Sequence, residues 1–505
     1  MSLDLAQTRP APQPVLLRDV PGQDRVLTQD ALGLAALLQT RFGHKLEALA
    51  VARQRRQERA DEGRLPDYLE ETAGTRKGVW SCAPAPVAFR DRRLGLACAA
   101  RGEALAQAAD TGAVLTVDLD EATPAGFANL VAGIAALTEA LAGTPAAAML
   151  LRPRPLDRDE PALMIAGAPV SAGLFDLALL LSHLAHPMAE AGQGPALQIG
   201  RLDGHRDAKL WAEILDLCEE HLGLAPNTIR VELSVETPGA AFEMDEMLWE
   251  MRDRAIGLTM RRADLAAAYL RLVRAHPDRL LPDRLDPDAA FLGTCAARMV
   301  KVAHRRGTHA IAEAPEADER LRAPFDEGCD GIRLDQPERI KPARAAIAAA
   351  LPDAHQIGRP RQYFRIEPEM LLRPHQGAVT EDGLRATVHV AIAALAAWIA
   401  GRGPVRIGEA THGLASADLA RARLGQWLRH GATVETPMGA RPMTADWLAE
   451  LIHEEIVSLV EWLGPHSFHR GRYASAARIV QEAASASTPP DHVARLAAPL
   501  IDTLD

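Results

Sequence analysis

The spacing of apolar residues changes at about residue 110. Before that point, residues 27–60 place apolar side chains at every third or fourth position, which predicts one or two amphipathic helices. After it, short apolar runs alternate with longer helical patterns. The runs are AVLTVDLD, AAAMLLRPR, ALQIGRLD, TIRVELSVE, GLTMRRAD, THAIAEA and DGIRLDQP. Strands that alternate with helices predict parallel pairing, and seven or eight such units favour a closed (β/α)8 TIM barrel over an open sheet.

The strand pattern ends at about residue 356, and helical spacing continues to the end of the chain. The Ala- and Leu-rich helical segments are 381–402, 415–430, 444–463 and 472–486. We expect the first of them to begin at Thr380, whose hydroxyl can cap the helix. The predicted fold is α/β, in three parts. These are an N-terminal helical segment (1–105), a TIM barrel (106–355) and a C-terminal helical domain that caps the barrel (356–505).

Composition and charge narrow the function classes. The 505 residues are 48% hydrophobic, enough for a globular core. A net charge of -11 and the lack of a basic block argue against a nucleic-acid partner. Five widely spaced cysteines without a CxxC pair favour a reducing compartment. Charged residues or His interrupt each apolar run before about 18 residues, and residues 1–14 lack a signal-peptide design, so we predict a cytoplasmic protein without a membrane partner.

Charged residues follow each predicted strand. They are Asp118, Asp120, Arg152, Arg154, Arg201, Asp203, Glu236, Asp264, Glu313 and Asp335. In a TIM barrel the carboxyl ends of the strands converge on one rim, where such enzymes keep their chemistry. Any one of these residues could be a solvated loop residue, but the repetition of the pattern favours a site.

Two of these carboxylates predict a metal site. Glu236 and Asp264 follow neighbouring predicted strands and are 28 residues apart, so both can reach the same part of the rim. Mg²⁺ prefers oxygen ligands and often uses one or two protein carboxylates, with water and substrate oxygens completing its shell. The pair therefore predicts a Mg²⁺ site.

Several motifs, in order, resemble the malate synthase family, in particular its shorter A-type branch. The resemblance extends from about residue 26 to 485. The matching stretches are LPDYLEETAGTRKGVW, LLRPR, VSAGLFDLALL, VETPGAAFEMDEMLWEMRD, LPDR, HRRGTHA, GAVTEDGLRATVHVAI and LGQWLRHGA. The resemblance implies an acyltransferase that condenses acetyl-CoA with glyoxylate and hydrolyses the malyl-CoA formed, using Mg²⁺ in a TIM barrel capped by a helical domain.

The resemblance also assigns roles to residues. It makes Glu236 and Asp264 the metal ligands. Arg152 falls at the family's catalytic arginine, which would stabilise the enolate oxygen of the thioester; Arg154 is the alternative for that role, or a salt-bridged loop residue. The supporting acids Asp118 and Asp120 would hold metal-bound waters or orient Arg152.

One departure from the family concerns the general base. Relatives carry Met-Glu-Asp-Ala-Ala before the helix that contains the QW pair, and the aspartate removes a proton from the acetyl methyl group. Counting back from LGQWL, that aspartate falls on Gly413 and the preceding glutamate on His412. We take His412 as the candidate replacement base because its ordinary pKa is near 6.5. Glu409 is the second candidate, and His412 as a plain loop residue is the alternative.

Other departures affect the substrates. Where the family has glycine and tryptophan before the metal-binding aspartate, this chain has Arg261 and Ala263. Residues 310–318 and 333–337 also differ from the family pattern. Three hypotheses remain: a malate synthase with a displaced base; a divergent Mg²⁺-dependent lyase or thioesterase for a malyl-CoA-like 3-hydroxyacyl-CoA or a related 2-oxo acid; and a non-catalytic homologue. Arg261, Arg262 and Arg333 would suit a substrate with an additional carboxylate.

Overall fold

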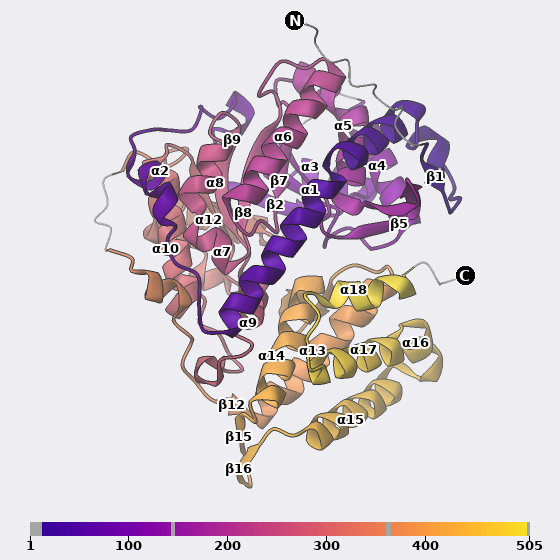
Figure 1. Cartoon of the computed structure of the whole chain (residues 1–505), viewed down its shortest axis with the longest axis vertical. Coiled ribbons are helices and arrows are strands. Elements are labelled where there is room, and N and C mark those ends of the chain that lie inside the picture. Colours follow the sequence, from indigo (N-terminus) through magenta and orange to yellow (C-terminus); the bar gives the residue numbers. More distant parts are fainter. Residues whose placement is uncertain (1–12, 143–146, 360–364, 502–505) are drawn as a thin grey trace, which may run out of the picture.

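The computed structural model describes residues 13–142, 147–359 and 365–501. Within them, eight parallel strands close into the predicted barrel, in the order β10-β11-β2-β3-β4-β7-β8-β9. The barrel strands are β2 (Leu94–Cys98), β3 (Val114–Asp118), β4 (Met149–Arg152), β7 (Ala196–Ile199), β8 (Arg230–Val235), β9 (Ala255–Met260), β10 (His309–Glu313) and β11 (Gly331–Leu334). Figure 1 shows the barrel in the upper part of the molecule and the C-terminal helices below it. The predicted (β/α)8 fold is confirmed.

Seven of the eight barrel strands coincide with the seven apolar runs, and the eighth corrects a domain boundary. Strand β2 lies before the boundary that we expected between residues 105 and 106, so the barrel begins earlier than predicted. Its sequence, LGLAC, follows the charged stretch RDRR and has only five residues. The run is therefore too short for the spacing of its apolar residues to identify it as a strand from one sequence.

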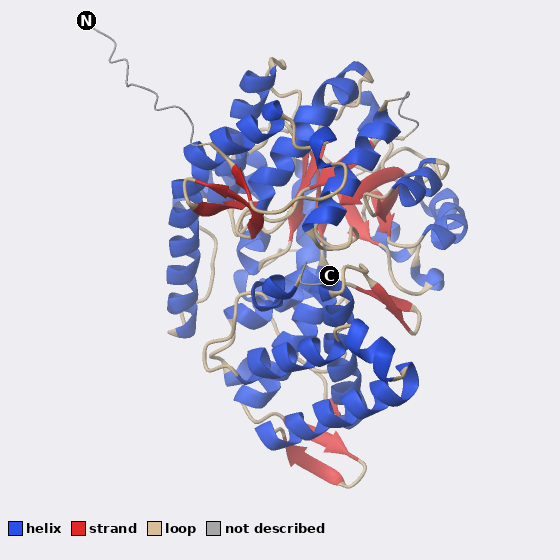
Figure 2. Cartoon of the chain, turned by 90° about the vertical axis from the view of Figure 1, so that its right-hand side faces the viewer, coloured by secondary structure: helices blue, strands red, loops and turns tan. Residues whose placement is uncertain are grey.

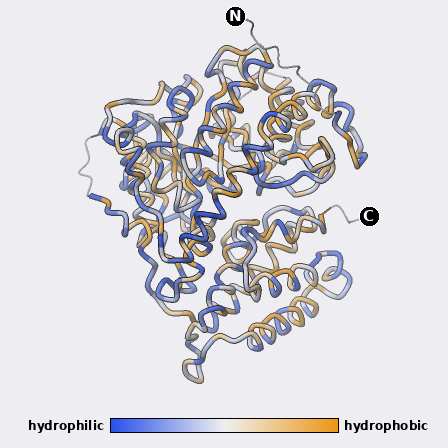
Figure 3. The backbone as a smooth tube through the Cα atoms, viewed as in Figure 1, coloured by the Kyte–Doolittle hydropathy of each residue, from blue (hydrophilic) through white to orange (hydrophobic). Residues whose placement is uncertain are grey.

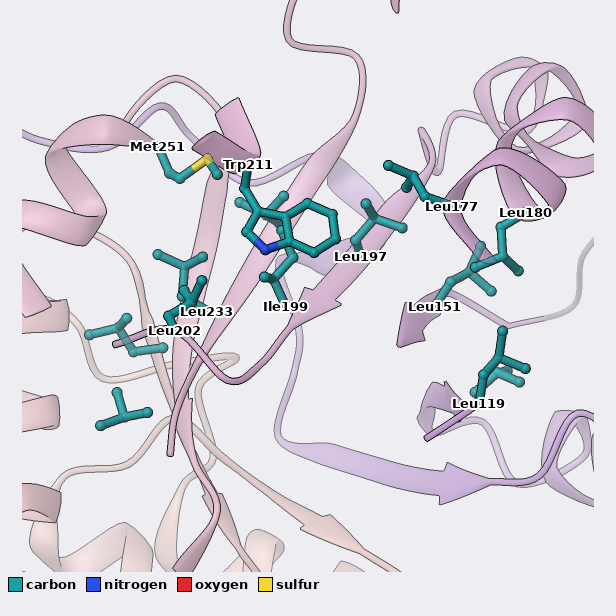
Figure 4. Close-up of a cluster of buried hydrophobic side chains, with 14 of the residues drawn as sticks. Leu119, Leu151, Leu177, Leu180, Leu197, Ile199, Leu202, Trp211, Leu233 and Met251 are labelled. Carbon is teal, nitrogen blue, oxygen red and sulfur yellow. The ribbon is translucent and has the colours of Figure 1, made fainter. Parts of the chain in front are cut away.

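Helices cover the outside of the barrel. They are α3 (Gly102–Ala109), α4 (Phe127–Leu141), α5 (Ala172–Glu190), α6 (His205–Leu222), α7 (Pro238–Phe242), α8 (Met244–Glu250), α9 (Arg262–Leu272), α10 (Ala290–Arg305), α11 (Ala323–Glu327) and α12 (Ile340–Ala350). Figure 4 shows how leucines of β4 and β7 pack against those of α5, with Trp211 of α6 beside Ile199. In Figure 3, hydrophobic and hydrophilic stretches alternate along the helices that surround the barrel. Burial of this apolar surface is the main stabilising contribution to the barrel.

The N-terminal segment packs along the side of the barrel. Helix α1 (Gln29–Asp61) begins at Thr28, whose hydroxyl accepts a hydrogen bond from the backbone N–H of Ala31, and it packs on α5 and α6. Helix α2 (Ala73–Lys77) follows. Strand β1 (Val15–Leu16) joins β5 (Asp159–Ile165) and β6 (Ala168–Ser171) in a small antiparallel sheet outside the barrel.

The C-terminal part is a helical domain, as predicted (Figure 2). Its helices are α13 (Glu381–Ile399), α14 (Leu414–Arg429), α15 (Ala445–Leu463), α16 (Pro465–Arg470), α17 (Tyr473–Ser485) and α18 (Val493–Ala497). Its short strands are β12 (Val379–Thr380), β13 (Val405–Ile407), β14 (Ala410–His412), β15 (Thr433–Thr436) and β16 (Gly439–Pro442). The expected cap of α13 is present, because the Thr380 hydroxyl accepts a hydrogen bond from the N–H of Gly383.

Within the described part of the chain, two helices are long and apolar enough to cross a membrane by length and composition alone. They are α5 and α13, and their most apolar windows are 72% and 67% buried inside the protein. Both therefore serve as core helices here, α5 behind the barrel and α13 at the centre of the C-terminal domain.

Candidate functional site

An arginine and a glutamate pair at the carboxyl ends of two barrel strands. Arg152 is the last residue of β4, and its Nη1 atom donates a hydrogen bond of 2.9 Å to Oε1 of Glu236, which follows β8. Both side chains are 2% exposed or less. Burial favours the neutral acid, but the charges of Arg152 and then Arg261 outweigh it and lower the pKa of Glu236. Glu236 is therefore held as a carboxylate.

Gly200 makes room for this pair. A Cβ atom at position 200 would lie 2.5 Å from Oε1 of Glu236 and 2.7 Å from Nη1 of Arg152, much closer than atoms pack. Any side chain there would push the two groups apart. The next residue, Arg201, has a positive φ of 54°, which is uncommon for a residue other than glycine. In this conformation its backbone N–H donates a 2.8 Å hydrogen bond to Oε2 of Glu236.

The predicted supporting acids lie beside Arg152. Oδ2 of Asp118 is 3.6 Å from Nε of Arg152, and Oδ2 of Asp120 is 3.7 Å from its Nη2. Asp120 also forms an ion pair with Arg158, 2.7 Å away. Burial raises the pKa of Asp120, but Arg158 and Arg152 more than compensate and lower it overall. The two acids thus orient the Arg152 guanidinium and offset its charge.

Arg261 lies among three carboxylates. Its Nε donates to Oδ2 of Asp264 at 3.1 Å, its Nη1 to Oδ2 of Asp118 at 3.2 Å, and its Nη2 to Oε2 of Glu121. This guanidinium therefore brings the loop after β3 against the start of α9. Burial and the neighbouring charge of Glu236 raise the pKa of Asp264, although Arg261 opposes the change.

Glu121 is a further acid of the site, and the sequence prediction missed it. One of its oxygens, Oε1, accepts a 2.9 Å hydrogen bond from the backbone N–H of Ala415, in the first turn of α14. The other oxygen would lie 3.5 Å from a Cβ atom on Gly413. Burial raises the pKa of Glu121 to about 8, against the effect of Arg261 and with further contributions from Asp264 and Asp120. Its sequence signal was its position directly after Asp118 and Asp120.

The family motifs LPDR and LGQWL position α14 over this cluster. Oε1 of Gln426 accepts a hydrogen bond of 2.9 Å from the N–H of Leu281, and Nε1 of Trp427 donates one of 2.8 Å to the carbonyl of Leu281. A second motif residue, Asp283, accepts hydrogen bonds from the backbone N–H and hydroxyl of Thr380. Helix α14 packs on α9, so the C-terminal domain is anchored directly beside the rim (Figure 1).

Two predicted residues lie outside this cluster. Arg154 forms ion pairs with Asp176 at 2.6 Å and Glu160 at 2.7 Å, which matches the alternative of a salt-bridged residue. His412 is half-buried on β14, and in the described part of the chain no hydrogen bond or ion pair joins it to Arg152, Glu236 or Asp264. Burial lowers its pKa; Glu316 opposes this change, and His389 adds to it.

The cluster can accommodate Mg²⁺ only through a small number of protein ligands. Among the described residues, no three His, Cys, Asp or Glu side chains are grouped so that they could hold a metal ion. Mg²⁺ does not require three, because it commonly binds one or two carboxylates and keeps several waters. Glu236 and Asp264 are close enough for the charge of one to raise the pKa of the other. The two carboxylates fit a Mg²⁺ site with two protein ligands. The guanidinium of Arg261 would compete with the ion for Asp264.

Two cavities border the cluster. One of about 290 Å³ lies against α1 and the β5–β6 hairpin, and Gly200 and Arg201 form part of its wall. A smaller one of about 60 Å³ is lined by Asp120, Arg158 and Trp398. The cluster is thus buried but has open space on its flanks.

A parallel barrel with carboxylates and an arginine at its carboxyl ends, capped by a helical domain, defines a TIM-barrel enzyme class. Three family models match in the order of the domains. "Malate synthase, N-terminal domain" matches residues 12–74, "Malate synthase, TIM barrel domain" matches 148–314, and "Malate synthase, C-terminal" matches 378–501. The chain belongs to the malate synthase family.

Individual proteins match most of the chain. The chain is 32% identical to the glyoxysomal malate synthase of Zea mays over 500 residues, which cover 90% of the chain and 89% of the relative. It is 27% identical to malate synthase A of Escherichia coli, over 91% of the chain and 92% of the relative. Among solved structures, the magnesium/glyoxylate complex of Haloferax volcanii malate synthase matches with a TM-score of 0.45 and 15% identity, covering 76% of this chain and 98% of that one.

Proposed function

We propose that this protein is a malate synthase that condenses acetyl-CoA with glyoxylate and hydrolyses the resulting thioester to malate. The observation that carries the proposal is the buried Arg152–Glu236 pair at the barrel rim, with Asp118, Asp120 and Asp264 around it. These are the residues to which the family resemblance assigns the metal site and the catalytic arginine. A protein kept only for its fold would have no need to bury so many charges.

Glu236 and Asp264 would hold Mg²⁺, which when bound would polarise the carbonyl group of the 2-oxo acid. Glu236 is prepared for this role because it is ionised and fixed by Arg152 and the N–H of Arg201. Asp264 lies in the first turn of helix α9, where the helix dipole also favours a carboxylate.

Arg152 would stabilise the enolate formed from acetyl-CoA. Its guanidinium cannot lose its charge, and its neighbours fix its orientation before the substrate arrives. Donors that are already oriented toward developing negative charge lower the activation barrier without reorganising during the reaction. Helix α14, anchored over the rim through Trp427, would help to exclude water from that step.

A second candidate is a related enzyme whose acyl-CoA or 2-oxo acid carries an additional carboxylate. Arg333 on β11 supports it. Its side chain is 7% exposed. Among the described residues, it forms an ion pair with Glu313 at 3.4 Å, and its Nη1 atom has no hydrogen-bond partner. Burial, and then the charge of Arg261, lower its pKa. A buried, incompletely paired guanidinium is suited to a bidentate interaction with a carboxylate.

Thiol release distinguishes the candidates. We expect free CoA from acetyl-CoA only when glyoxylate and Mg²⁺ are both present, with malate as the product. Replacing glyoxylate by 2-oxo acids with a second carboxylate tests the alternative, which predicts that one of them supports faster release. Thiol from malyl-CoA but not from acetyl-CoA would indicate a thioesterase, and acetyl-CoA and glyoxylate from malyl-CoA without free thiol would indicate a lyase. No reaction with any of these substrates would contradict both proposals.

The cellular location stays a prediction. We propose the cytoplasm, in keeping with five buried cysteines, four of which have pKa values raised to about 12 by burial and so resist oxidation.

A further inference from the structure

We propose that Glu121, on the loop after β3, is the general base that replaces the aspartate missing at position 413. This inference rests on the proposed function. Its basis is geometric: Oε2 of Glu121 lies 3.5 Å from the place where the Cβ atom of a residue at 413 would be. A carboxylate supplied by the barrel therefore reaches the region that the family fills with a carboxylate from the C-terminal domain.

The position of Glu121 is set from three directions. Its backbone N–H donates a 2.9 Å hydrogen bond to Oδ1 of Asp118, and the N–H of Ala415 binds Oε1. Arg261 binds Oε2. The side chain is 13% exposed, so the carboxylate is nearly enclosed between the barrel rim and α14. The carboxylate is held in one position and does not rotate freely in solvent. A general base requires such fixed positioning.

Ion pairs also connect Glu121 to Arg152, the residue proposed to stabilise the negative charge of the enolate. Oδ2 of Asp118 lies 3.2 Å from Nη1 of Arg261 and 3.6 Å from Nε of Arg152. The chain Glu121–Arg261–Asp118–Arg152 thus links the carboxylate to the arginine proposed to stabilise the enolate. An acetyl thioester between them would have its methyl group toward Glu121 and its oxygen toward Arg152.

In the proposed reaction, Glu121 accepts a proton from the methyl carbon, the C–H bond breaks, and its electron pair moves toward the thioester oxygen beside Arg152. The enolate carbon then forms a C–C bond to the aldehyde carbon of glyoxylate, the aldehyde π bond breaks, and the aldehyde oxygen becomes an alkoxide. Glu121 returns its proton through solvent, so that the alkoxide becomes the hydroxyl of malyl-CoA. Water then adds to the thioester carbonyl, the C–S bond breaks, and the products are a carboxylate and free CoA thiol.

Glu121 also has a structural role that the test must separate from catalysis. It caps the buried N-terminus of α14, where Gly413 offers no side chain for that purpose. Glutamine can still accept the hydrogen bond from Ala415, but it cannot accept a proton from carbon. Glu121→Gln therefore removes the base and keeps the cap.

The experiment measures exchange of the acetyl-CoA methyl protons in D2O with Mg²⁺ and pyruvate, together with thiol release with glyoxylate. We expect Glu121→Gln to lower the exchange rate and kcat about 100-fold or more, with KM for acetyl-CoA within about twofold. Gly413→Asp in the Glu121→Gln background should restore at least about tenfold of the loss. The site permits it, because the added Cβ meets only ordinary contacts of 3.5–3.9 Å at a φ of −108°.

Gly413→Asn in the same background is the matched control, because it adds the same bulk without a base, and we expect no rescue. Wild-type exchange in the Glu121→Gln variant would overturn the role of Glu121 while leaving the proposed function intact. Equal rescue by Asp and Asn would also overturn it, because the effect would then be structural. A wild-type protein that neither exchanges methyl protons nor releases thiol would overturn the proposed function, and the base assignment with it.

Discussion

Arg261 is the residue that most alters the expected chemistry of the rim. Its guanidinium binds Asp118, Glu121 and Asp264 at once, and it stands where the family resemblance expects a glycine. A fixed positive charge in this position competes with a divalent cation for Asp264. The charge of Arg261 also offsets the burial of these three carboxylates beside one another.

Removing Arg261 should therefore strengthen metal binding. We expect Arg261→Ala to bind Mn²⁺, a probe for Mg²⁺, at least about tenfold more tightly than the wild type, a gain of about 1.4 kcal/mol. Calorimetry and the electron paramagnetic resonance of free Mn²⁺ measure this directly. Glu236→Gln is the control, and it should weaken binding because it removes a proposed ligand. Equal affinities of Arg261→Ala and the wild type would show that Arg261 does not compete with the ion.

Helix α14 is the element on which the site depends. Its N-terminus meets Glu121, and its middle is anchored to the barrel through Gln426 and Trp427. Further along, Asp418 pairs with Arg421, and with Arg271 of α9 at 3.2 Å. Burial raises the pKa of Asp418, but Arg421, His492 and Arg271 outweigh it and lower it overall. Polar contacts thus fix the register of α14 against the barrel.

Trp427→Phe tests this anchoring. The indole N–H is lost, the buried carbonyl of Leu281 is left without that donor, and a small cavity forms. We expect the free energy of unfolding in urea to fall by about 1–3 kcal/mol, together with a lower kcat as α14 loses its fixed position. Trp462→Phe on α15 is the matched control, because that indole is 78% exposed. Similar losses in the two variants would contradict a specific role for Trp427.

The buried side chain of His309 makes the free energy of unfolding of the whole molecule depend on pH. Both ring nitrogens of His309, in β10, lie 3.2 Å from backbone carbonyls, those of Ile256 and Arg90. Burial, with a contribution from Arg92, lowers the pKa of His309 to about 4. Between that value and the ordinary 6.5, the unfolded chain binds more protons than the folded one, so folding stability falls as the pH falls.

Acidification from pH 7 to pH 5 should therefore destabilise the barrel, by about 2 kcal/mol from His309 alone. Urea unfolding of the wild type at the two pH values measures the loss. His309→Gln should show a smaller loss on acidification, even if its stability at pH 7 is lower. The same pH dependence in the variant and the wild type would assign the effect to other groups, such as His492, whose pKa burial also lowers.

The amino-acid sequence by itself determined the barrel, the order of its parts and the acids and arginine at its rim. Strands such as TIRVELSVE can be predicted from the local pattern of apolar residues. In a parallel barrel, the residues that follow the strands all lie at the same rim. Arg152, Glu236 and Asp264 could therefore be placed together without coordinates. The missing aspartate at Gly413 was inferred from the resemblance to the malate synthase family, by counting back from LGQWL to the position that the family's aspartate occupies.

Only the tertiary structure decided which carboxylate lies near the position of the missing aspartate. Glu121 and Ala415 are 294 positions apart and belong to different domains, so no local pattern relates them. His412, the nearest candidate in sequence, lies near Glu316 and His389 and makes no hydrogen bond or ion pair with Arg152, Glu236 or Asp264 among the described residues, whereas Glu121 reaches from the barrel to the start of α14. No sequence pattern indicated that Arg152 and Glu236 pack closely against Gly200, or that Arg261 contacts three carboxylates. Periodicity and strand direction are local properties of a chain, but the reach of a side chain across a domain boundary is set by packing.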